Sequence, residues 1–135
     1  MARVIVGVGM DLIDILRIER LLARKGDRAL ARLFTQAERD YALVRARPAQ
    51  HLASRLAAKE AAFKALSGSR EARAIGWRDI EVVVQPDGRP TLAFHDAARH
   101  RAELLCVTRA WVTMTHSATT AGAVVVLERE APGTS

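Results

Sequence analysis

The feature that most constrains this chain is a run of helix-forming and apolar residues at positions 49–66. Placed 100° apart, its alanines, leucines and phenylalanine cover nearly the whole circumference of a helix. A helix that is apolar on almost all sides belongs in a core. Yet Lys59, Glu60 and Lys64 stand near its middle. Charges in an apolar setting are costly unless they are paired or bind a metal, so this helix predicts a site.

The helix alone leaves two interpretations open. Glu60 and Lys64 have the four-residue spacing of an ordinary ion pair on a solvated face, worth only about 0.3–0.5 kcal/mol. However, Ala53 and Ala57 lie on the same stripe, and such small residues let another backbone or a ligand approach closely. Neither interpretation names a reaction.

The N-terminal third predicts one strand and two helices. Residues 3–10 are rich in Val and Ile with interleaved glycines, which indicates a buried strand that stops at Asp11. A helix is expected from Asp14, whose carboxylate can cap its first turn, to about Gly26. A capping-box pair opens the next helix, which runs to about residue 46; the pair is Thr35 and Glu38.

The C-terminal half predicts mainly antiparallel strands. Ser67-Gly68-Ser69 ends the central helix, and two strands at residues 80–85 and 91–95 follow, joined by a tight turn at Asp87-Gly88. The last expected elements are a helix at 96–104 and strands at 109–115 and 121–128. We therefore expect an α+β fold, a small single domain at residues 1–129 with an antiparallel sheet packed against helices. Residues 130–135 are expected to form a disordered tail.

Composition narrows the class of protein. The chain has 135 residues, 50% of them hydrophobic, which suits one modest core. Its single cysteine, Cys106, lies in an apolar run, which predicts a buried thiol and a reducing, cytoplasmic location. No apolar stretch is long enough for a bilayer, so we expect no membrane partner. The net charge of +6 favours an anionic partner, while 4% aromatic residues offer little for stacking on nucleic-acid bases.

Two further residues are candidates for chemistry. Asp11 follows a glycine-bearing strand, where it either caps the next helix or binds a metal. A magnesium site needs only one or two protein carboxylates, so Asp11 and Glu60 would suffice. His116, at the end of a predicted strand, is a weaker candidate, because lone histidines more often have no catalytic role.

Five segments, taken together and in this order, resemble those of a known family, although none of them would be specific by itself. They are Gly7-Val8-Gly9-Met10-Asp11 followed by Arg17-Ile18, residues 32–35, residues 55–65, Gly88-Arg89-Pro90, and Thr113-Met114-Thr115-His116. Over residues 3–128 the chain thus resembles the holo-acyl-carrier-protein synthase family of phosphopantetheinyl transferases. The resemblance implies a homotrimer with coenzyme A bound in clefts between neighbouring subunits.

The resemblance also implies an activity and a set of ligands. The enzyme would transfer 4′-phosphopantetheine from coenzyme A to a serine of apo acyl carrier protein, releasing adenosine 3′,5′-bisphosphate, in fatty acid or polyketide biosynthesis. Asp11 and Glu60 would coordinate Mg²⁺, with Mn²⁺ as the alternative, and Lys64 would contact phosphate. Glu60 is the first candidate for the general base and His116 the second.

Other positions acquire roles only by the same resemblance. Arg47 would hold the 3′-phosphate of coenzyme A, and the cofactor cleft would be lined by Arg55, Pro90 and His116. The helix face formed by Arg17, Arg20 and Arg24 would bind the acidic helix of the carrier protein, although spacing alone fits a solvated basic face equally well.

Two other functions compete with this one. A non-enzymatic nucleic-acid-binding module would need a continuous basic stripe, whereas the arginines here are interleaved with acids, so we expect no nucleic-acid partner. A transferase for carrier domains of larger synthases would be about twice as long. The chain departs from the family pattern at Ser67-Gly68-Ser69 and at Phe63, which bears on how the cofactor is contacted.

Overall fold

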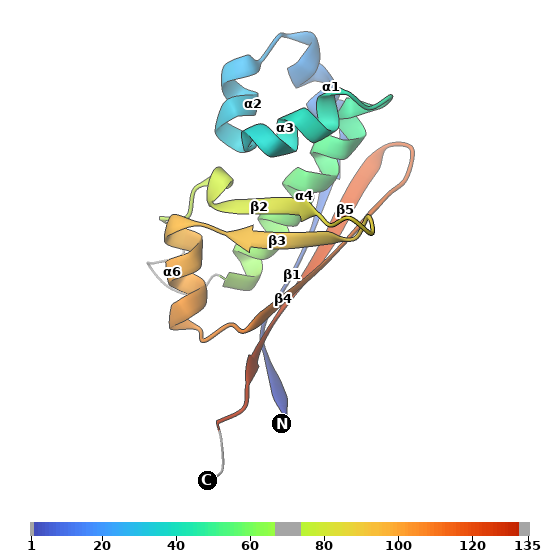
Figure 1. Ribbon diagram of the computed structural model, residues 1–135. Coiled ribbons are helices and arrows are strands. Elements are labelled where there is room, and N and C mark those ends of the chain that lie inside the picture. Colours follow the sequence, from blue (N-terminus) through green and yellow to red (C-terminus); the bar gives the residue numbers. More distant parts are fainter. Residues whose placement is uncertain (1, 67–73, 133–135) are drawn as a thin grey trace.

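The computed structural model describes residues 2–66 and 74–132, in which two antiparallel sheets and several helices surround one central helix (Figure 1). In chain order the elements are β1 (Arg3–Asp14), α1 (Ile15–Ala23), α2 (Asp27–Leu33), α3 (Gln36–Leu43), α4 (Pro48–Leu66), the 3₁₀ turn η1 (Trp77–Asp79), β2 (Ile80–Val84), β3 (Pro90–Phe94), α6 (Asp96–Leu104), β4 (Arg109–His116) and β5 (Thr120–Glu130). One sheet has the order β1-β5-β4, and β2 and β3 form the other. The predicted α+β class is confirmed.

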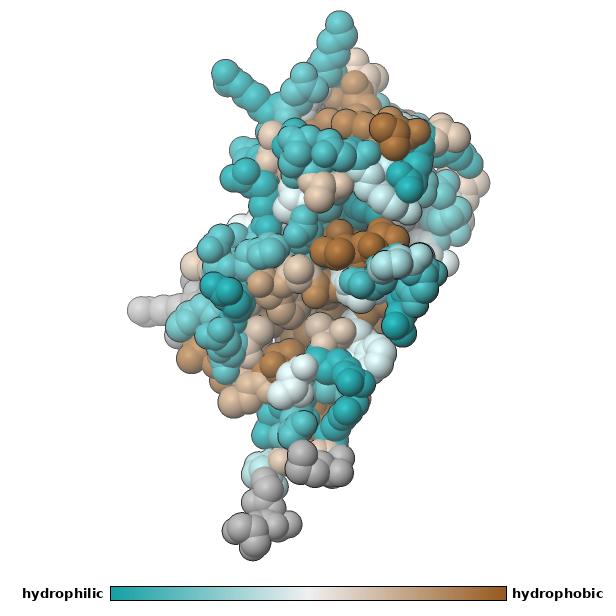
Figure 2. Space-filling view, viewed as in Figure 1, coloured by the Kyte–Doolittle hydropathy of each residue, from teal (hydrophilic) through white to brown (hydrophobic). Residues whose placement is uncertain are grey.

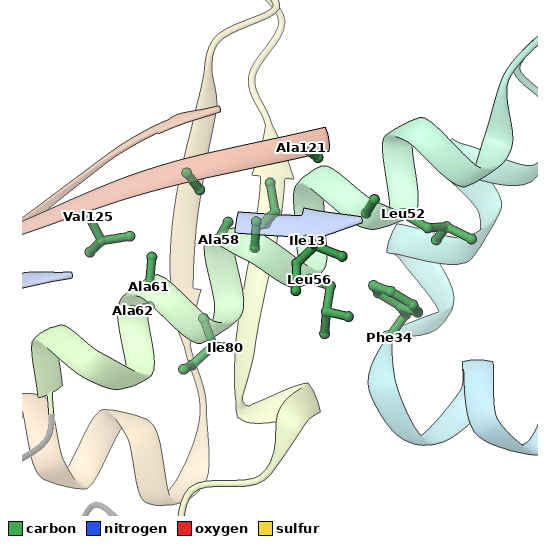
Figure 3. Close-up of a cluster of buried hydrophobic side chains, with 14 of the residues drawn as sticks. Ile13, Phe34, Leu52, Leu56, Ala58, Ala61, Ala62, Ile80, Ala121 and Val125 are labelled. Atoms are coloured by element: carbon green, nitrogen blue, oxygen red, sulfur yellow. The ribbon is translucent and has the colours of Figure 1, made fainter. Parts of the chain in front are cut away.

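The central helix α4 is the core, as its composition predicts. Pro48 takes the first helical position, where its missing N–H breaks no helical hydrogen bond. Figure 3 shows α4 lying against β1 and β5, with its alanines facing the strands and Leu56 facing Phe34. Alanine loses no rotamer freedom on burial, so the helix packs closely at little entropic cost. The residues of α4 with no exposed surface are Leu52, Ala53, Leu56, Ala57, Ala58, Ala61, Ala62 and Leu66.

Two glycines of β1 set the strand directly on the backbone of α4. A Cβ atom at Gly7 would lie 2.1 Å from the carbonyl oxygen of Ala65, and one at Gly9 would lie 1.8 Å from that of Ala61. No side chain fits at such distances. The strand and the helix are therefore held main chain against main chain.

The prediction for β1 itself was wrong in two respects. The strand does not stop at Asp11, because β5 pairs with it as far as Asp14, and Asp11 lies opposite Ala123 in this ladder. Nor is the strand buried on both faces. Its outward side chains are between 59% and 66% exposed, namely Ile5, Val8, Met10 and Leu12. Because only one face packs on α4, the other presents an apolar surface.

The helices after β1 were predicted in part. The helix expected from Asp14 to about Gly26 is present as α1, which ends at Ala23, whereas α2, which begins at Asp27, was not anticipated. Asp14 occupies the N-cap position of α1, but its side chain makes no capping hydrogen bond. The capping box of α3 is confirmed: Glu38 N donates to Thr35 Oγ1 at 3.2 Å, and Thr35 N donates to Glu38 Oε1 at 2.9 Å.

The C-terminal elements match the prediction within one or two residues. At the β2–β3 turn only Gly88 has a positive φ, +87°, and its N–H donates to the carbonyl of Gln85 at 2.8 Å. Asp87 does not have the positive φ that the first residue of an Asp-Gly pair adopts in a type I′ hairpin turn. Cys106 is exposed, because it lies just past the end of α6 with φ +59°, so the predicted buried thiol is wrong.

Some expectations fall outside what the structure covers. Ser67-Gly68-Ser69 lies outside the described residues, as do the last three residues of the expected tail. In residues 2–66 and 74–132, none of the helices has the length and hydropathy needed to cross a membrane.

Candidate active site

Three of the residues singled out in the sequence meet where β1 crosses α4. Lys64 Nζ lies 2.9 Å from Asp11 Oδ1 and donates a second hydrogen bond to the carbonyl of Met10 at 3.0 Å. Glu60, one turn earlier on α4, is half-buried beside Asp11. The ion pair of Lys64 therefore joins two elements and is not the local Glu60–Lys64 pair of a solvated helix.

The two carboxyl groups strongly perturb each other. Burial and the neighbouring Asp11 raise the pKa of Glu60 to about 7. Burial also acts to raise the pKa of Asp11, but its contacts with Glu60 and Lys64 outweigh burial and lower that pKa. Asp11 Oδ2 is buried and finds no hydrogen-bond partner among the described residues. Two facing carboxyls with an orphaned oxygen have more negative charge than Lys64 can balance.

This donor set fits a hard divalent cation. Carboxylate oxygens are the ligands that Mg²⁺ and Mn²⁺ take, and Asp11 Oδ2 has an unused lone pair beside Glu60. Within the described parts of the chain, no three His, Cys, Asp or Glu side chains cluster as a complete metal cage. Asp11 and Glu60 would thus supply two ligands and leave the other positions to water and to a phosphorylated substrate.

An apolar pocket of about 220 Å³ adjoins this pair. Glu60 and Lys64 lie on its polar side, and its apolar lining is provided by Phe63, Ile75, Trp77 and Ile80. Phe63 is a wall of this pocket and is 37% exposed.

A second cluster gathers on another face of α4. Arg55, Pro90 and His116, which the resemblance assigns to the cofactor cleft, line one pocket of about 180 Å³. Arg55 is almost fully buried; it stacks 4.3 Å from the centre of the Tyr41 ring and donates to the carbonyl of His51 at 3.2 Å. Burial lowers the pKa of Arg55, and burial together with nearby arginines lowers that of His51. This cluster suits an anion.

The sequence missed three members of this second cluster. Tyr41 receives two guanidinium groups on its ring, from Arg55 and from Arg45, the latter at 3.3 Å from the ring centre. His51, to which the sequence assigned nothing, also lines the pocket; its four-residue spacing from Arg55 on one helix was the available signal. Arg47 instead lines a neighbouring pocket with Ile15 and Glu19, so Arg45 is the arginine beside Arg55.

The two clusters do not merge within one chain. His116 Nε2 lies 2.8 Å from the side-chain nitrogen of Gln50. Gln50 and Glu60 are ten residues apart on α4, or about 15 Å along its axis. The structure brings Asp11, Glu60 and Lys64 together, but His116 lies elsewhere.

The arginines of α1 surround a third feature. Arg17, Arg20 and Arg24 are exposed and line a groove of about 380 Å³ with apolar residues such as Leu21 and Leu33. Figure 2 shows hydrophilic side chains over α1–α3 with hydrophobic patches among them. Arg17 is close enough to Glu60 to oppose the rise in its pKa, so this groove adjoins the carboxylate pair.

Comparison with known proteins identifies the family of this chain. A family model described as the 4′-phosphopantetheinyl transferase superfamily matches residues 7–121. The chain therefore belongs to the 4′-phosphopantetheinyl transferase superfamily, as the resemblance predicted.

Named relatives within this superfamily are holo-[acyl-carrier-protein] synthases. That of Alkalilimnicola ehrlichii is 47% identical over 125 residues, covering 92% of this chain and 97% of the relative. The acyl carrier protein synthase of Mycobacterium tuberculosis is 41% identical with a TM-score of 0.68, over 96% of this chain and 100% of that one. The Bacillus anthracis synthase, solved in complex with CoA (3′,5′-ADP), is 32% identical with a TM-score of 0.74, over the same shares.

Proposed function

We propose that this protein transfers the 4′-phosphopantetheine group of coenzyme A to a serine hydroxyl of apo acyl carrier protein. The observation that carries the proposal is the Asp11–Glu60 carboxyl pair, with its orphaned oxygen beside Lys64, in a chain 47% identical to a holo-[acyl-carrier-protein] synthase. The products are holo acyl carrier protein and adenosine 3′,5′-bisphosphate, which serves fatty acid or polyketide biosynthesis.

The chemistry is a displacement at phosphorus. The serine oxygen forms a bond to the β-phosphorus of coenzyme A, and the bond from that phosphorus to the bridging oxygen breaks. Negative charge grows on the leaving bisphosphate, and the ammonium group of Lys64 stabilises it. Mg²⁺ or Mn²⁺, held by Asp11 and Glu60, would supply further positive charge against the pyrophosphate oxygens. Positioning provides much of the rest.

Glu60 is our first candidate to accept the serine proton. It would act directly or through a bound water, and Arg17 nearby connects it with the groove of α1. His116 is the second candidate. Because it lies with Gln50 in the other cluster, it would have to reach the reacting serine from a neighbouring copy.

A homotrimer would unite the two clusters. The pockets beside Glu60 and beside Arg55, about 220 Å³ and 180 Å³, are each smaller than the roughly 300–1,000 Å³ of typical pockets for drug-sized ligands. A cleft between copies would offer Lys64 of one copy to the pyrophosphate, and Arg55, Pro90 and His116 of the next to the 3′-phosphate end. Arg45 joins Arg47 there as a candidate for that phosphate.

The apolar outer face of β1 supports such an assembly. Ile5, Val8, Met10 and Leu12 form a row of exposed hydrophobic side chains, as expected of an oligomer interface. Leu12→Glu should dissociate the assembly, which light scattering of the eluting protein would show. A monomeric wild-type protein with full activity would contradict the proposal.

The groove of α1 is our proposed docking surface for the carrier protein. Its rim carries Arg17, Arg20 and Arg24 and its lining includes Leu21 and Leu33, which complements an acidic amphipathic helix. Arg17→Glu should raise the KM for carrier protein far more than the KM for coenzyme A. Equal increases for both substrates would refute this surface.

The single cysteine, which precludes an internal disulfide, is compatible with the cytoplasmic location that we propose.

The activity is tested by incubating the protein with coenzyme A, Mg²⁺ and an apo acyl carrier protein, followed by intact-mass analysis of the carrier. The carrier should gain the mass of one phosphopantetheine, and omission of Mg²⁺ with a chelator should prevent the gain. A carrier that stays unmodified, while a known synthase modifies the same sample, would defeat the proposal.

A further inference from the structure

Lys59, next to Glu60 in the chain, has an environment unlike that of any other lysine here. Its side chain has no exposed surface, and its three ammonium protons have three acceptors. These are Glu38 Oε1 at 2.7 Å, the carbonyl of Trp77 at 2.9 Å and the carbonyl of Ile80 at 2.6 Å. The ring of Phe34 lies 5.8 Å away as a further contact. Lys59 thus has no hydrogen-bonding capacity left for a substrate.

Both carboxylate oxygens of Glu38, the partner of Lys59, also accept hydrogen bonds from backbone N–H groups. Its Oε1 also accepts from Thr35 N in the capping box of α3, and its Oε2 accepts from Val82 N in β2 at 2.9 Å. The Thr35 hydroxyl in turn donates to Glu81 on β2 at 2.6 Å. The pair therefore ties α4 to the start of α3, to η1 and to β2 in one buried network.

This network sets the rotation of α4 about its own axis. Successive helical residues point 100° apart, so Lys59 directed into the network leaves Glu60 directed at Asp11 on β1. The same bonds hold Trp77, a wall of the pocket that Glu60 adjoins. Gly7 and Gly9 keep α4 close to β1, but without the Lys59 bonds the side of α4 that faces η1 and β2 loses its polar contacts, and the Glu60 carboxyl can shift relative to Asp11.

We propose that Lys59 and Glu38 are positioning residues, whose buried pairing aligns Glu60 with Asp11 for the reaction. This inference rests on the proposed function, since it assigns a task to a site that binds the metal and the pyrophosphate. Lys59 lines the pocket beside Glu60, but the hydrogen-bonding groups of Lys59 and Glu38 are buried and engaged with protein partners, so neither residue is assigned a polar contact with the substrate.

The test compares three variants with the wild type. Lys59→Met removes the ammonium but leaves the Glu38 carboxylate buried and unpaired, which is strongly destabilising. The double variant Lys59→Met/Glu38→Gln has no charge at these two buried positions and should regain most of the lost melting temperature. It cannot restore the bonds to Trp77 and Ile80. Leu127→Ala, in the buried face of β5, is the control for destabilisation without contact with the network.

We expect both Lys59 variants to lose about 10- to 100-fold in kcat, as displacements near 1 Å can cost. The KM for carrier protein should change much less than kcat, because the arginine rim of the groove belongs to α1 and only Leu56 of its lining belongs to α4. As a readout independent of activity, Mn²⁺ binding in the presence of adenosine 3′,5′-bisphosphate, followed by electron paramagnetic resonance, should weaken about 10- to 100-fold. Leu127→Ala should keep the wild-type kcat and Mn²⁺ affinity at temperatures below its melting point.

Two results would overturn the positioning role. One is a stable double variant with wild-type kcat and Mn²⁺ affinity. The other is an equal loss of kcat in Leu127→Ala, which would make the effect one of general stability. Failure of the proposed function would look different, because the wild-type protein itself would then modify no carrier.

Discussion

Two charged clusters lie one residue apart on α4 and differ in how completely their groups are paired. Around Lys59 and Glu38, each ammonium proton and both carboxylate oxygens have a partner, and the two side chains have no exposed surface. Around Glu60 and Asp11, one carboxylate oxygen is buried without a partner among the described residues, and the pKa of Glu60 is raised to about 7. Burial of charged side chains alone would not distinguish the two clusters.

The difference teaches which charges hold the fold and which await a ligand. A network that satisfies its own groups rigidifies the core, whereas a network left incomplete keeps coordination positions for something else. The incomplete cluster is stabilised in place by the complete one beside it. Substitutions in the two should therefore separate activity from stability.

The largest expected effect is the loss of activity in Glu60→Gln. It removes one carboxylate ligand of the proposed metal, and transfer should fall at least about 1,000-fold, the scale for losing a main electrostatic contact to the transition state. The initial rate of carrier modification measures this. Stability should not fall. Glu103→Gln, at an exposed position of α6, is the matched control and should keep wild-type activity.

The next effect in size belongs to the complete cluster. Glu38→Leu leaves the Lys59 ammonium buried without its partner and should lower the free energy of unfolding by about 3–5 kcal/mol in urea titrations. Asp11→Asn, in the incomplete cluster, should change that free energy by less than about 1 kcal/mol, because the ion pair of Asp11 with the exposed Lys64 is screened by solvent and the burial of the carboxylate offsets part of the gain. Equal losses in the two variants would erase the contrast.

A smaller effect is expected from moving the strand that carries Asp11. Gly9→Ala places a Cβ against the Ala61 carbonyl, so β1 must shift, at a cost of about 1–3 kcal/mol in stability. Transfer activity should fall as well, because Asp11 moves with the strand. Gly76→Ala, whose Cβ would meet nothing nearer than 3.6 Å, should stay within about 0.5 kcal/mol of wild type.

The smallest effect is a pH dependence of the metal-free protein. The pKa of Glu60 in the folded protein is about 7, which lies above its ordinary value of 4.5. The ionised Glu60 therefore destabilises the folded protein; this destabilisation is absent below about pH 4.5 and reaches its full size above pH 7. In a chelator, Glu60→Gln should therefore melt at a higher temperature than wild type at pH 8, with the difference vanishing near pH 4.5. Calorimetry at both values checks this. A constant difference between them would mean that Glu60 titrates normally.

Much of the fold could be predicted from local signals. A signal within a few neighbouring residues predicts each of three elements, namely the alanine-rich helix, the capping box at Thr35 and the hairpin at Gly88. The extent of β1 could not, because Asp11 stays in the strand through pairing with Ala123, far along the chain. The exposed outer face of β1 likewise depends on which side α4 covers.

The sequence could predict which residues belong to the candidate site, but not which partners they contact. Asp11, Glu60 and Lys64 could be named from motif and burial, but the partners of each charge come from distant segments. Lys59 meets Glu38 from another helix, and Lys64 meets Asp11 from a strand, so no spacing rule on α4 could assign them. For the same reason the sequence could not tell that the i,i+4 neighbours Glu60 and Lys64 act through different contacts.

The contact of Gly9 with Ala61 has a consequence for how this chain can vary. A clash between two side chains can be relieved by substituting a smaller residue at the second position, and most core positions allow such compensating pairs of substitutions. Here the obstacle is a main-chain carbonyl, which all twenty residue types carry, so no replacement of Ala61 makes room at position 9. A selection for second-site suppressors of Gly9→Ala should accordingly return the original glycine, or changes that displace β1 as a whole, and none at position 61.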